Sequence, residues 1–162
     1  NVNKPVLTDT SSSDAATEEL KQAFFDGEPK VLATSLRGTL TEGVDFDGDK
    51  LKAAVVCGVP ITNTSTNLSQ AIQSAYDGRF DNNNGFDYAF TVPAVRKTRQ
   101  ALGRVIRGVE DVGVRVLIDE RYANSRTFTS VREHFPEHAT DEFKPISPPE
   151  LGRELQHFWS QH

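Results

Sequence analysis

The sequence contains no methionine and only one cysteine, Cys57. A single thiol cannot form an internal disulfide, and it cannot hold a zinc ion or an iron–sulfur cluster by itself. No apolar run approaches the ~18 residues that a bilayer crossing needs, and residues 1–10 show no signal-peptide pattern. We therefore expect a cytoplasmic (intracellular) protein, nucleoid-associated in a prokaryote, with no membrane contact. The missing initiator methionine predicts a piece of a longer protein.

Basic residues are outnumbered: 18 Lys and Arg stand against 23 Asp and Glu, which gives a net charge of −5. Because binding to nucleic-acid phosphates needs cations, this balance argues against undirected polyanion binding and leaves a local basic site open. The 162 residues, with 36% hydrophobic and 25% charged, fit one polar globular domain, so residues 1–162 are predicted to form a single domain.

Short apolar runs alternate with helical patterns along the chain. The predicted strands are 5–8, 30–34, 51–59 and 112–119, and the predicted helices are 15–25, 68–76, 93–106, 129–135 and 149–159. This alternation predicts an α/β domain with a mainly parallel sheet and helices on both faces, in which Cys57 is a buried small hydrophobe. Ligands of such sheets bind at the carboxyl ends of strands, so we expect a site in the loops after Thr34, Val59 and Asp119.

The helix predicted at 93–106 has an unusual charge pattern. Between Asp87 and Glu110 there is no acidic residue, and the basic residues of this stretch are Arg96, Lys97, Arg99, Arg104 and Arg107. On a helix, Gln100, Arg104 and Arg107 would share one face. Gly103 lies beside that face and would let a backbone or a phosphate approach. Two guanidinium groups one turn apart can bind one polyphosphate. The alternative is a solvated basic face on a structural helix.

Three segments resemble motifs of superfamily 2 helicases. Residues 100–107 (QALGRVIR) resemble the last motif, Q-x-x-G-R-x-x-R, and the continuation GVEDVGVRVLIDERY resembles its XPD/DinG branch. Residues 35–48 (SLRGTLTEGVDFDG) are similar to the preceding motif, whose core is E-G-x-D-F, and GVPITNTS also fits that branch. The resemblance covers about residues 5–122. It implies the second of two RecA-like motor domains, with the P-loop NTPase type of fold.

The resemblance also implies roles at a nucleotide site between the two motor domains. ATP would bind in the cleft, with Arg107 as the arginine finger, Arg104 close to the γ-phosphate and Gln100 helping to close the cleft. The residues expected on the cofactor are Gly43, Asp45 and Gly103, the first two near the ribose. For Asp45 an alternative is that it caps its own backbone.

The same resemblance implies that Ser35 and Arg37 contact the backbone of single-stranded DNA, although Arg37 could equally be an ordinary surface residue. The implied partners are single-stranded DNA, ATP and the first motor domain. The implied activity is that of an ATP-dependent DNA helicase acting in DNA repair. The alternative is a catalytically silent module of the same fold that binds nucleic acid or a protein.

The chain has neither a G-x-x-x-x-G-K-[S/T] phosphate loop nor an Asp-Glu-Ala-His run. ATP with Mg²⁺ would therefore be held mostly by the first motor domain, where the family's four-cysteine iron–sulfur cluster also belongs. His134 and His138 have metal-pair spacing, but Pro136 intervenes and no third ligand is evident, so no metal site is predicted. We predict that the chain alone neither hydrolyses ATP nor unwinds DNA.

Overall fold

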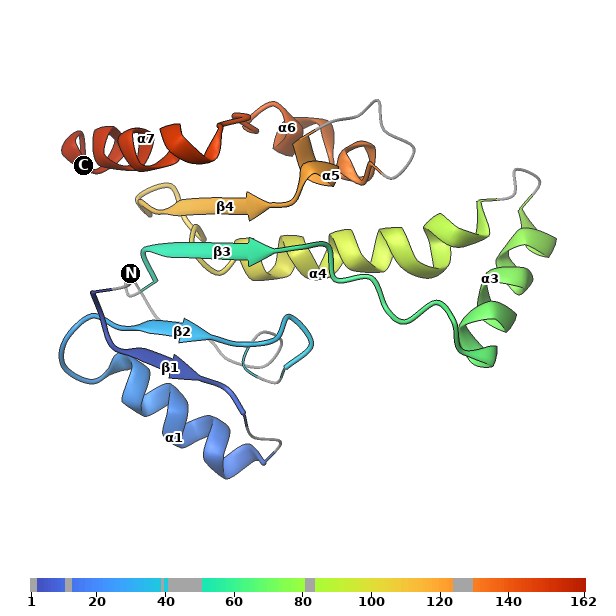
Figure 1. Ribbon diagram of the computed structural model, residues 1–162, viewed down its shortest axis with the longest axis horizontal. Coiled ribbons are helices and arrows are strands. Elements are labelled where there is room, and N and C mark those ends of the chain that lie inside the picture. Colours follow the sequence, from blue (N-terminus) through green and yellow to red (C-terminus); the bar gives the residue numbers. More distant parts are fainter. Residues whose placement is uncertain (1–2, 11–12, 39, 41–50, 81–83, 124–129) are drawn as a thin grey trace.

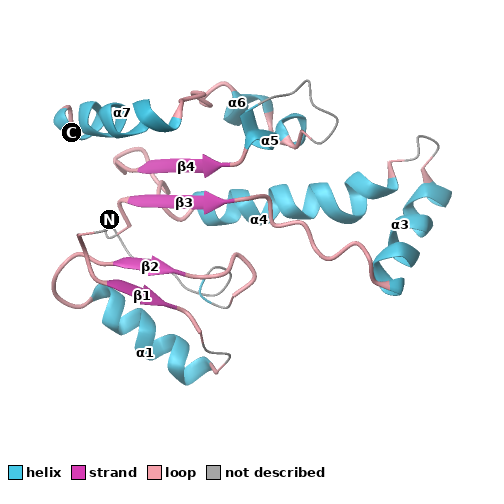
Figure 2. Cartoon of the chain, in the orientation of Figure 1, coloured by secondary structure: helices cyan, strands magenta, loops and turns pink. Residues whose placement is uncertain are grey.

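The chain folds into an α/β structure whose four described strands point the same way (Figure 1). The computed structural model describes residues 3–10, 13–38, 40, 51–80, 84–123 and 130–162. Figure 2 shows how helices and strands alternate in it. In chain order the elements are β1 (Val6–Thr8), α1 (Asp14–Phe25), β2 (Val31–Ala33), β3 (Ala53–Cys57), α3 (Asn67–Arg79), the π-helix η2 (Asp87–Thr91), α4 (Val92–Leu102), β4 (Val114–Ile118), α5 (Glu120–Ala123), the 3-10 helix η3 (Arg132–His134), α6 (Glu137–Thr140) and α7 (Pro148–Ser160).

The strands form two parallel pairs, which confirms the predicted α/β class. β1 pairs with β2, with Val6 opposite Val31, and β3 pairs with β4, with Val55 opposite Val116. Parallel neighbours need a crossover connection. Here α1 lies between β1 and β2 in the chain, and α3, η2 and α4 lie between β3 and β4. Each pair therefore has one edge of amino ends and one edge of carboxyl ends, and the carboxyl ends of both pairs point to the same side of the molecule (Figure 1).

Helix α1 begins and ends where its sequence predicts. The Ser13 hydroxyl accepts a hydrogen bond from the amide of Ala16 at 3.4 Å, and Gly27 follows the helix with a φ of 69°, a left-handed conformation that suits glycine. Leu40, only 1% exposed, forms the centre of the adjoining core. The hydrophobic residues packed around it are Leu20, Phe24, Phe25, Leu32 and Leu51. This cluster joins α1 and β2 to the segment that enters β3.

Helix α4 covers one face of β3. Val56 is 3% exposed and clusters with Ala101 and Leu102 of α4. Side chains alternate across a strand, so Val55, which is 56% exposed, and Cys57 point the other way. The prediction that Cys57 is buried is therefore wrong, because Val56 takes the position that faces the helix.

The C-terminal part matches its prediction in one helix and differs in the other. Helix α7 begins with the capping box of Ser147 and Glu150 and spans the predicted segment. Of the helix predicted over 129–135, residue 129 lies outside the described residues, and the rest forms only the single 3-10 turn η3, followed at Phe135 by extended backbone before Pro136. The fixed φ and missing N–H of Pro136 explain why that turn does not continue as a helix. Within the described ranges, no helix is both long enough and apolar enough for a bilayer crossing.

A buried polar network joins α4 to the carboxyl ends of β3 and β4. The Tyr122 hydroxyl donates to the Gly58 carbonyl at 3.0 Å and lies 3.1 Å from the Thr98 hydroxyl. Thr98 Oγ1 is also 3.0 Å from the Ala94 carbonyl. Tyr122 is 2% exposed and Thr98 0%. Burial raises the pKa of the Tyr122 phenol, which keeps its proton available for Gly58 at neutral pH.

We expect Tyr122→Phe to lower the free energy of unfolding by about 1–3 kcal/mol, because it leaves the half-buried Gly58 carbonyl without this donor. Urea denaturation of the chain measures the change. Tyr88→Phe is the matched control: Tyr88 is 41% exposed and its ring stacks on Phe80, which the variant preserves. Its expected change is within about 0.5 kcal/mol. Equal losses in the two variants would contradict the role of the network.

Candidate functional site

Helix α4 ends earlier than the sequence predicts. It follows the π-helix η2, where the amide of Val92 donates to the carbonyl of Asp87 just before Pro93, and it ends at Leu102 rather than near residue 106. The amide of Gly103 still bonds the Arg99 carbonyl at 2.8 Å, but those of Arg104 and Val105 bond carbonyls three residues back at 3.3 Å. This is the tighter 3-10 pattern of a helix end.

Arg104 and Arg107 consequently lie beyond the helix. The prediction that they share one helical face with Gln100 is wrong, because the helical spacing no longer applies after Leu102. Gly103, with its weak helix preference, is the cap residue. We call residues 103–111, which carry both arginines from α4 towards β4, the arginine turn.

The arginine turn is attached to the sheet by Val105. This side chain is 6% exposed, and it lies against Gly113 so closely that a Cβ atom on Gly113 would fall far inside 3.0 Å of Val105 Cγ1. The same Cβ would lie 3.2 Å from the Lys52 carbonyl, which accepts a hydrogen bond from the amide of Val114 at 3.0 Å. Val105 is therefore held at the amino ends of β3 and β4. This long-range contact explains why the chain leaves the helix where it does.

A second restraint, internal to the turn, lies near its other end. Oδ2 of Asp111 accepts hydrogen bonds from the amides of Arg107 at 2.7 Å and Gly108 at 2.8 Å, while the Asp111 amide donates to the Gly108 carbonyl at 3.3 Å. The hydrogen bonds from Arg107 and Gly108 lower the pKa of the Asp111 carboxyl, so this group is ionised at neutral pH. Sequence analysis missed Asp111. Asp side chains can bond backbone groups three or four residues earlier in the chain, but nothing in the sequence distinguished Asp111 from other loop carboxylates.

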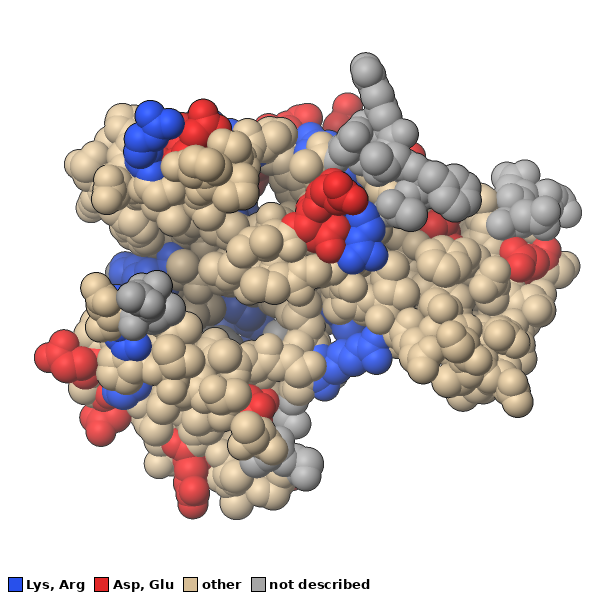
Figure 3. All heavy atoms as spheres, in the orientation of Figure 1, with Lys and Arg blue, Asp and Glu red and all other residues tan. Residues whose placement is uncertain are grey.

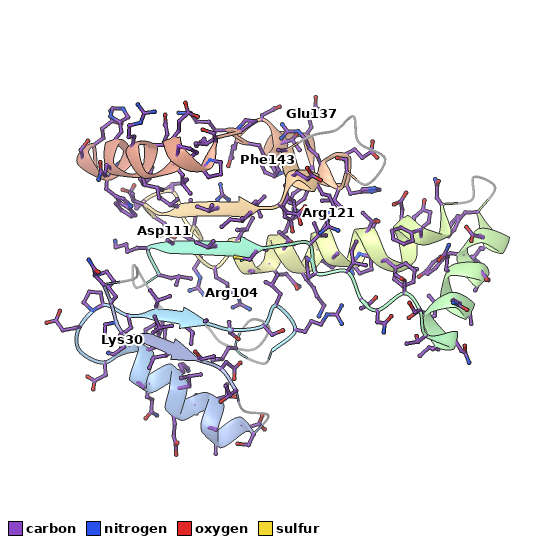
Figure 4. The ribbon with its side chains drawn as sticks, in the orientation of Figure 1. Lys30, Arg104, Asp111, Arg121, Glu137 and Phe143 are labelled. Carbon is purple, nitrogen blue, oxygen red and sulfur yellow. The ribbon has the colours of Figure 1, made fainter. Side chains whose placement is uncertain are left out.

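The residues predicted to contact the nucleotide differ in their exposure to solvent. Arg107, Gln100 and Gly103 are exposed, and Arg104 is half-buried. A Cβ on Gly103 would meet only carbonyls of its own helix, the nearest 3.2 Å away at Arg99. Figure 4 shows Arg104 below β3 at the end of α4, and Asp111 near the start of β3. In Figure 3, Lys and Arg side chains gather in the hollow between the part with β1 and β2 and the part with β3 and β4.

The predicted DNA residues lie at the opposite edge. Ser35 and Arg37 follow β2, and the Ser35 hydroxyl accepts a hydrogen bond from the Arg37 amide at 3.3 Å. Nη2 of Arg37 donates to the carbonyl of Pro60, which follows β3, at 3.4 Å. Both residues are exposed, so they belong to the carboxyl edge of the strands. The structure brings these two together but separates them from the arginine turn.

The remaining predictions concern Gly43, Asp45 and the absence of a metal site. Gly43 and Asp45 lie outside the described residues, so their predicted place near a ribose stays a prediction. Among the residues that the structure does describe, there is no group of three or more His, Cys, Asp or Glu side chains arranged to hold a metal ion. The described part of the chain therefore has the arginine turn at the amino edge of the strands and the turn with Ser35 and Arg37 at the carboxyl edge.

A family model for the helicase C-terminal domain matches residues 1–138 of the chain. The XPD helicase subunit of the general transcription and DNA repair factor IIH from Dictyostelium discoideum is 33% identical over 124 residues, which are 74% of this chain and 16% of that protein. The corresponding subunit from Schizosaccharomyces pombe is 31% identical over 137 residues, 82% of this chain and 17% of the relative.

Two further proteins are similar over most of the chain. A regulator of telomere elongation helicase 1 homolog from Drosophila yakuba is 28% identical over 166 residues, covering 98% of this chain and 17% of the relative. A solved structure of an XPD helicase superposes with a TM-score of 0.54 at 20% identity, over 76% of this chain and 22% of that one. This chain thus spans about a sixth of the length of its curated relatives.

Proposed function

Because the chain belongs to the family of helicase C-terminal domains, we propose that it forms the second of two RecA-like motor domains in a DNA helicase. In this proposal ATP lies between the two domains, and the arginine turn presents Arg107 and Arg104 to its phosphates. The observation that carries the proposal is the arginine turn itself: it exposes Arg107, is attached to the strands by Val105, and is closed internally by the hydrogen bonds of Asp111.

The chemistry of the arginine turn suits phosphoryl transfer. A guanidinium group stays charged at any relevant pH and offers a planar set of donors to phosphate oxygens. An arginine placed on the transferred γ-phosphoryl group stabilises the charge of the transition state and is worth ~10³–10⁵ in rate. We assign the finger role to Arg107, which is exposed, and the γ-phosphate contact to the half-buried Arg104. Gln100 and Gly103, both exposed at the end of α4, would face the neighbouring domain.

The sequence contains no phosphate-binding loop of its own. In the proposal, the first motor domain holds ATP and Mg²⁺, and Mg²⁺ neutralises charge on the phosphates when bound there. This chain contributes the cations of the arginine turn and closes the cleft from the other side. Gly43 and Asp45 are proposed to lie near the ribose.

The opposite edge of the strands supports the DNA part of the proposal. Ser35 and Arg37 are exposed at the carboxyl edge, where the side chain of Arg37 is held by Pro60. A strand advances roughly 3.3 Å per residue, so the five residues of β3 keep the two edges roughly 15 Å apart. One domain could then contact nucleotide at one edge and the single-stranded DNA backbone at the other. Since similar proteins are subunits of a transcription and DNA repair factor, we propose a role in DNA repair.

The proposal predicts that activity needs more than this chain. The full-length protein that carries it is expected to hydrolyse ATP faster when single-stranded DNA is added, and the chain alone is expected to show no DNA-stimulated hydrolysis. Phosphate release measured for both proteins at equal concentration, with and without DNA, is the experiment. A DNA-stimulated rate in the chain alone, or none in the full-length protein, would contradict the proposed function.

A further inference from the structure

Asp111 joins the two ends of the loop that carries Arg107. Its Oδ2 atom accepts the hydrogen bonds from the amides of Arg107, at 2.7 Å, and Gly108, at 2.8 Å. We propose that Asp111 is a positioning residue for Arg107, whose guanidinium it presents at the amino edge of β3 and β4 by holding the backbone of the arginine turn. The inference rests on the proposed function of Arg107.

The backbone at this point belongs to neither a helix nor a strand. Arg107 lies beyond the end of α4, so no helical hydrogen bond holds it. Gly108, Val109 and Glu110 are all exposed, with Val109 at 99%. Glycine gives a chain more conformational freedom than any other residue. The two amide bonds to one side-chain oxygen therefore restrain the backbone conformation of this loop.

Arg107 stands between two fixed points. Val105 is buried against Gly113 on one side, and Asp111 bonds the Arg107 amide itself on the other. A side chain that acts on a transition state must be placed accurately, since a displacement of about 1 Å can cost ~10²-fold in rate. Loss of the Asp111 attachment should therefore reduce catalysis without removing any group that touches ATP.

Three variants separate geometry from charge. Asp111→Ala removes the acceptor. Asp111→Asn removes the charge but keeps an oxygen at the same distance along the side chain, and this oxygen can accept both bonds. Asp111→Glu keeps the charge but moves the carboxylate one methylene further out. The proposal expects the alanine and glutamate variants to lose activity and the asparagine variant to keep most of it.

In the full-length protein, we expect Asp111→Ala and Asp111→Glu to lower kcat for DNA-stimulated ATP hydrolysis by about 10- to 100-fold, with KM for ATP changed by less than about threefold. Asp111→Asn should stay within about threefold of the parent kcat. Because Asp111 acts through Arg107, adding Asp111→Ala to Arg107→Ala should cause no further fall. Should the alanine variant fail to fold, the asparagine and glutamate pair still decides the question.

The controls keep this inference separate from the proposed function. Glu110→Ala removes a neighbouring exposed carboxylate and should leave kcat unchanged. If Arg107→Ala keeps full activity, the proposed function is wrong. If Arg107→Ala is inactive while Asp111→Ala and Asp111→Glu are fully active, only the role of Asp111 is wrong. Full activity in Asp111→Glu with loss in Asp111→Asn would also overturn it, because charge rather than geometry would then matter.

Discussion

Replacing Arg107 with alanine in the full-length protein is expected to lower kcat for ATP hydrolysis by about 10³-fold or more. The side chain is exposed at the amino edge of the strands, and the proposal places it on charge that develops as the γ-phosphoryl group is transferred. An interaction made only in the transition state affects kcat and leaves KM for ATP nearly unchanged. Phosphate release in the presence of saturating single-stranded DNA measures both constants.

Two matched arginine variants show whether the loss belongs to Arg107. Arg99→Ala removes an exposed guanidinium from the last turn of α4, and we expect it to retain kcat within about twofold. Arg37→Ala acts at the carboxyl edge, where it should weaken binding of single-stranded DNA and raise the DNA concentration that activates hydrolysis. Fluorescence anisotropy with a labelled single strand gives the DNA affinity of all three variants.

The same measurements decide between a motor domain and a catalytically silent binding module. In a motor domain, Arg107→Ala loses ATP hydrolysis and keeps its affinity for DNA. In a silent module, Arg107 and Arg104 would bind the phosphodiester backbone. Arg107→Ala would then weaken DNA binding and make the DNA affinity less dependent on salt concentration. A parallel loss of both activities would count against the motor assignment.

Local signals in the sequence located the elements whose ends depend on nearby residues. Ser13 and Gly27 bound α1 through a side-chain cap and a left-handed backbone, and Ser147 with Glu150 starts α7. The end of α4 could not be found in this way. It depends on Val105 meeting Gly113 and the backbone of Lys52, and Lys52 lies more than 50 residues away in the chain. A helical charge pattern carries no information about such a contact.

The rule for parallel sheets predicted the edge at which Ser35 and Arg37 lie, but it did not predict the position of the arginine turn. The rule that ligands bind at the carboxyl ends of strands led to the loops after Thr34, Val59 and Asp119, and Ser35 and Arg37 lie at that edge. The arginine turn lies at the other edge, because the segment that leaves the crossover helix α4 must enter β4 at its amino end. A motif in the turn after a crossover helix should therefore be sought at the amino edge.

Gly113→Ala is expected to lower the free energy of unfolding of the chain by about 2 kcal/mol and its Tm by roughly 4–8 °C. The new methyl group would overlap Val105 Cγ1 and stand 3.2 Å from the Lys52 carbonyl. Val105 is 6% exposed and has little room to move, so the arginine turn must shift away from β3 and β4. Circular dichroism during thermal and urea denaturation measures the loss, and in the full-length protein kcat should fall as well.

Gly152→Ala is the matched control, since a Cβ there, inside α7, would meet nothing within 4 Å. It should raise stability by about 0.5–1 kcal/mol, as expected for alanine in place of glycine within a helix. Val105→Ala removes the atom that the new methyl group meets, so Gly113→Ala should cost much less in that background than in the parent. An unchanged cost would mean that Val105 is not what Gly113 accommodates, and the loss would then come from the approach of the new methyl group to the Lys52 carbonyl.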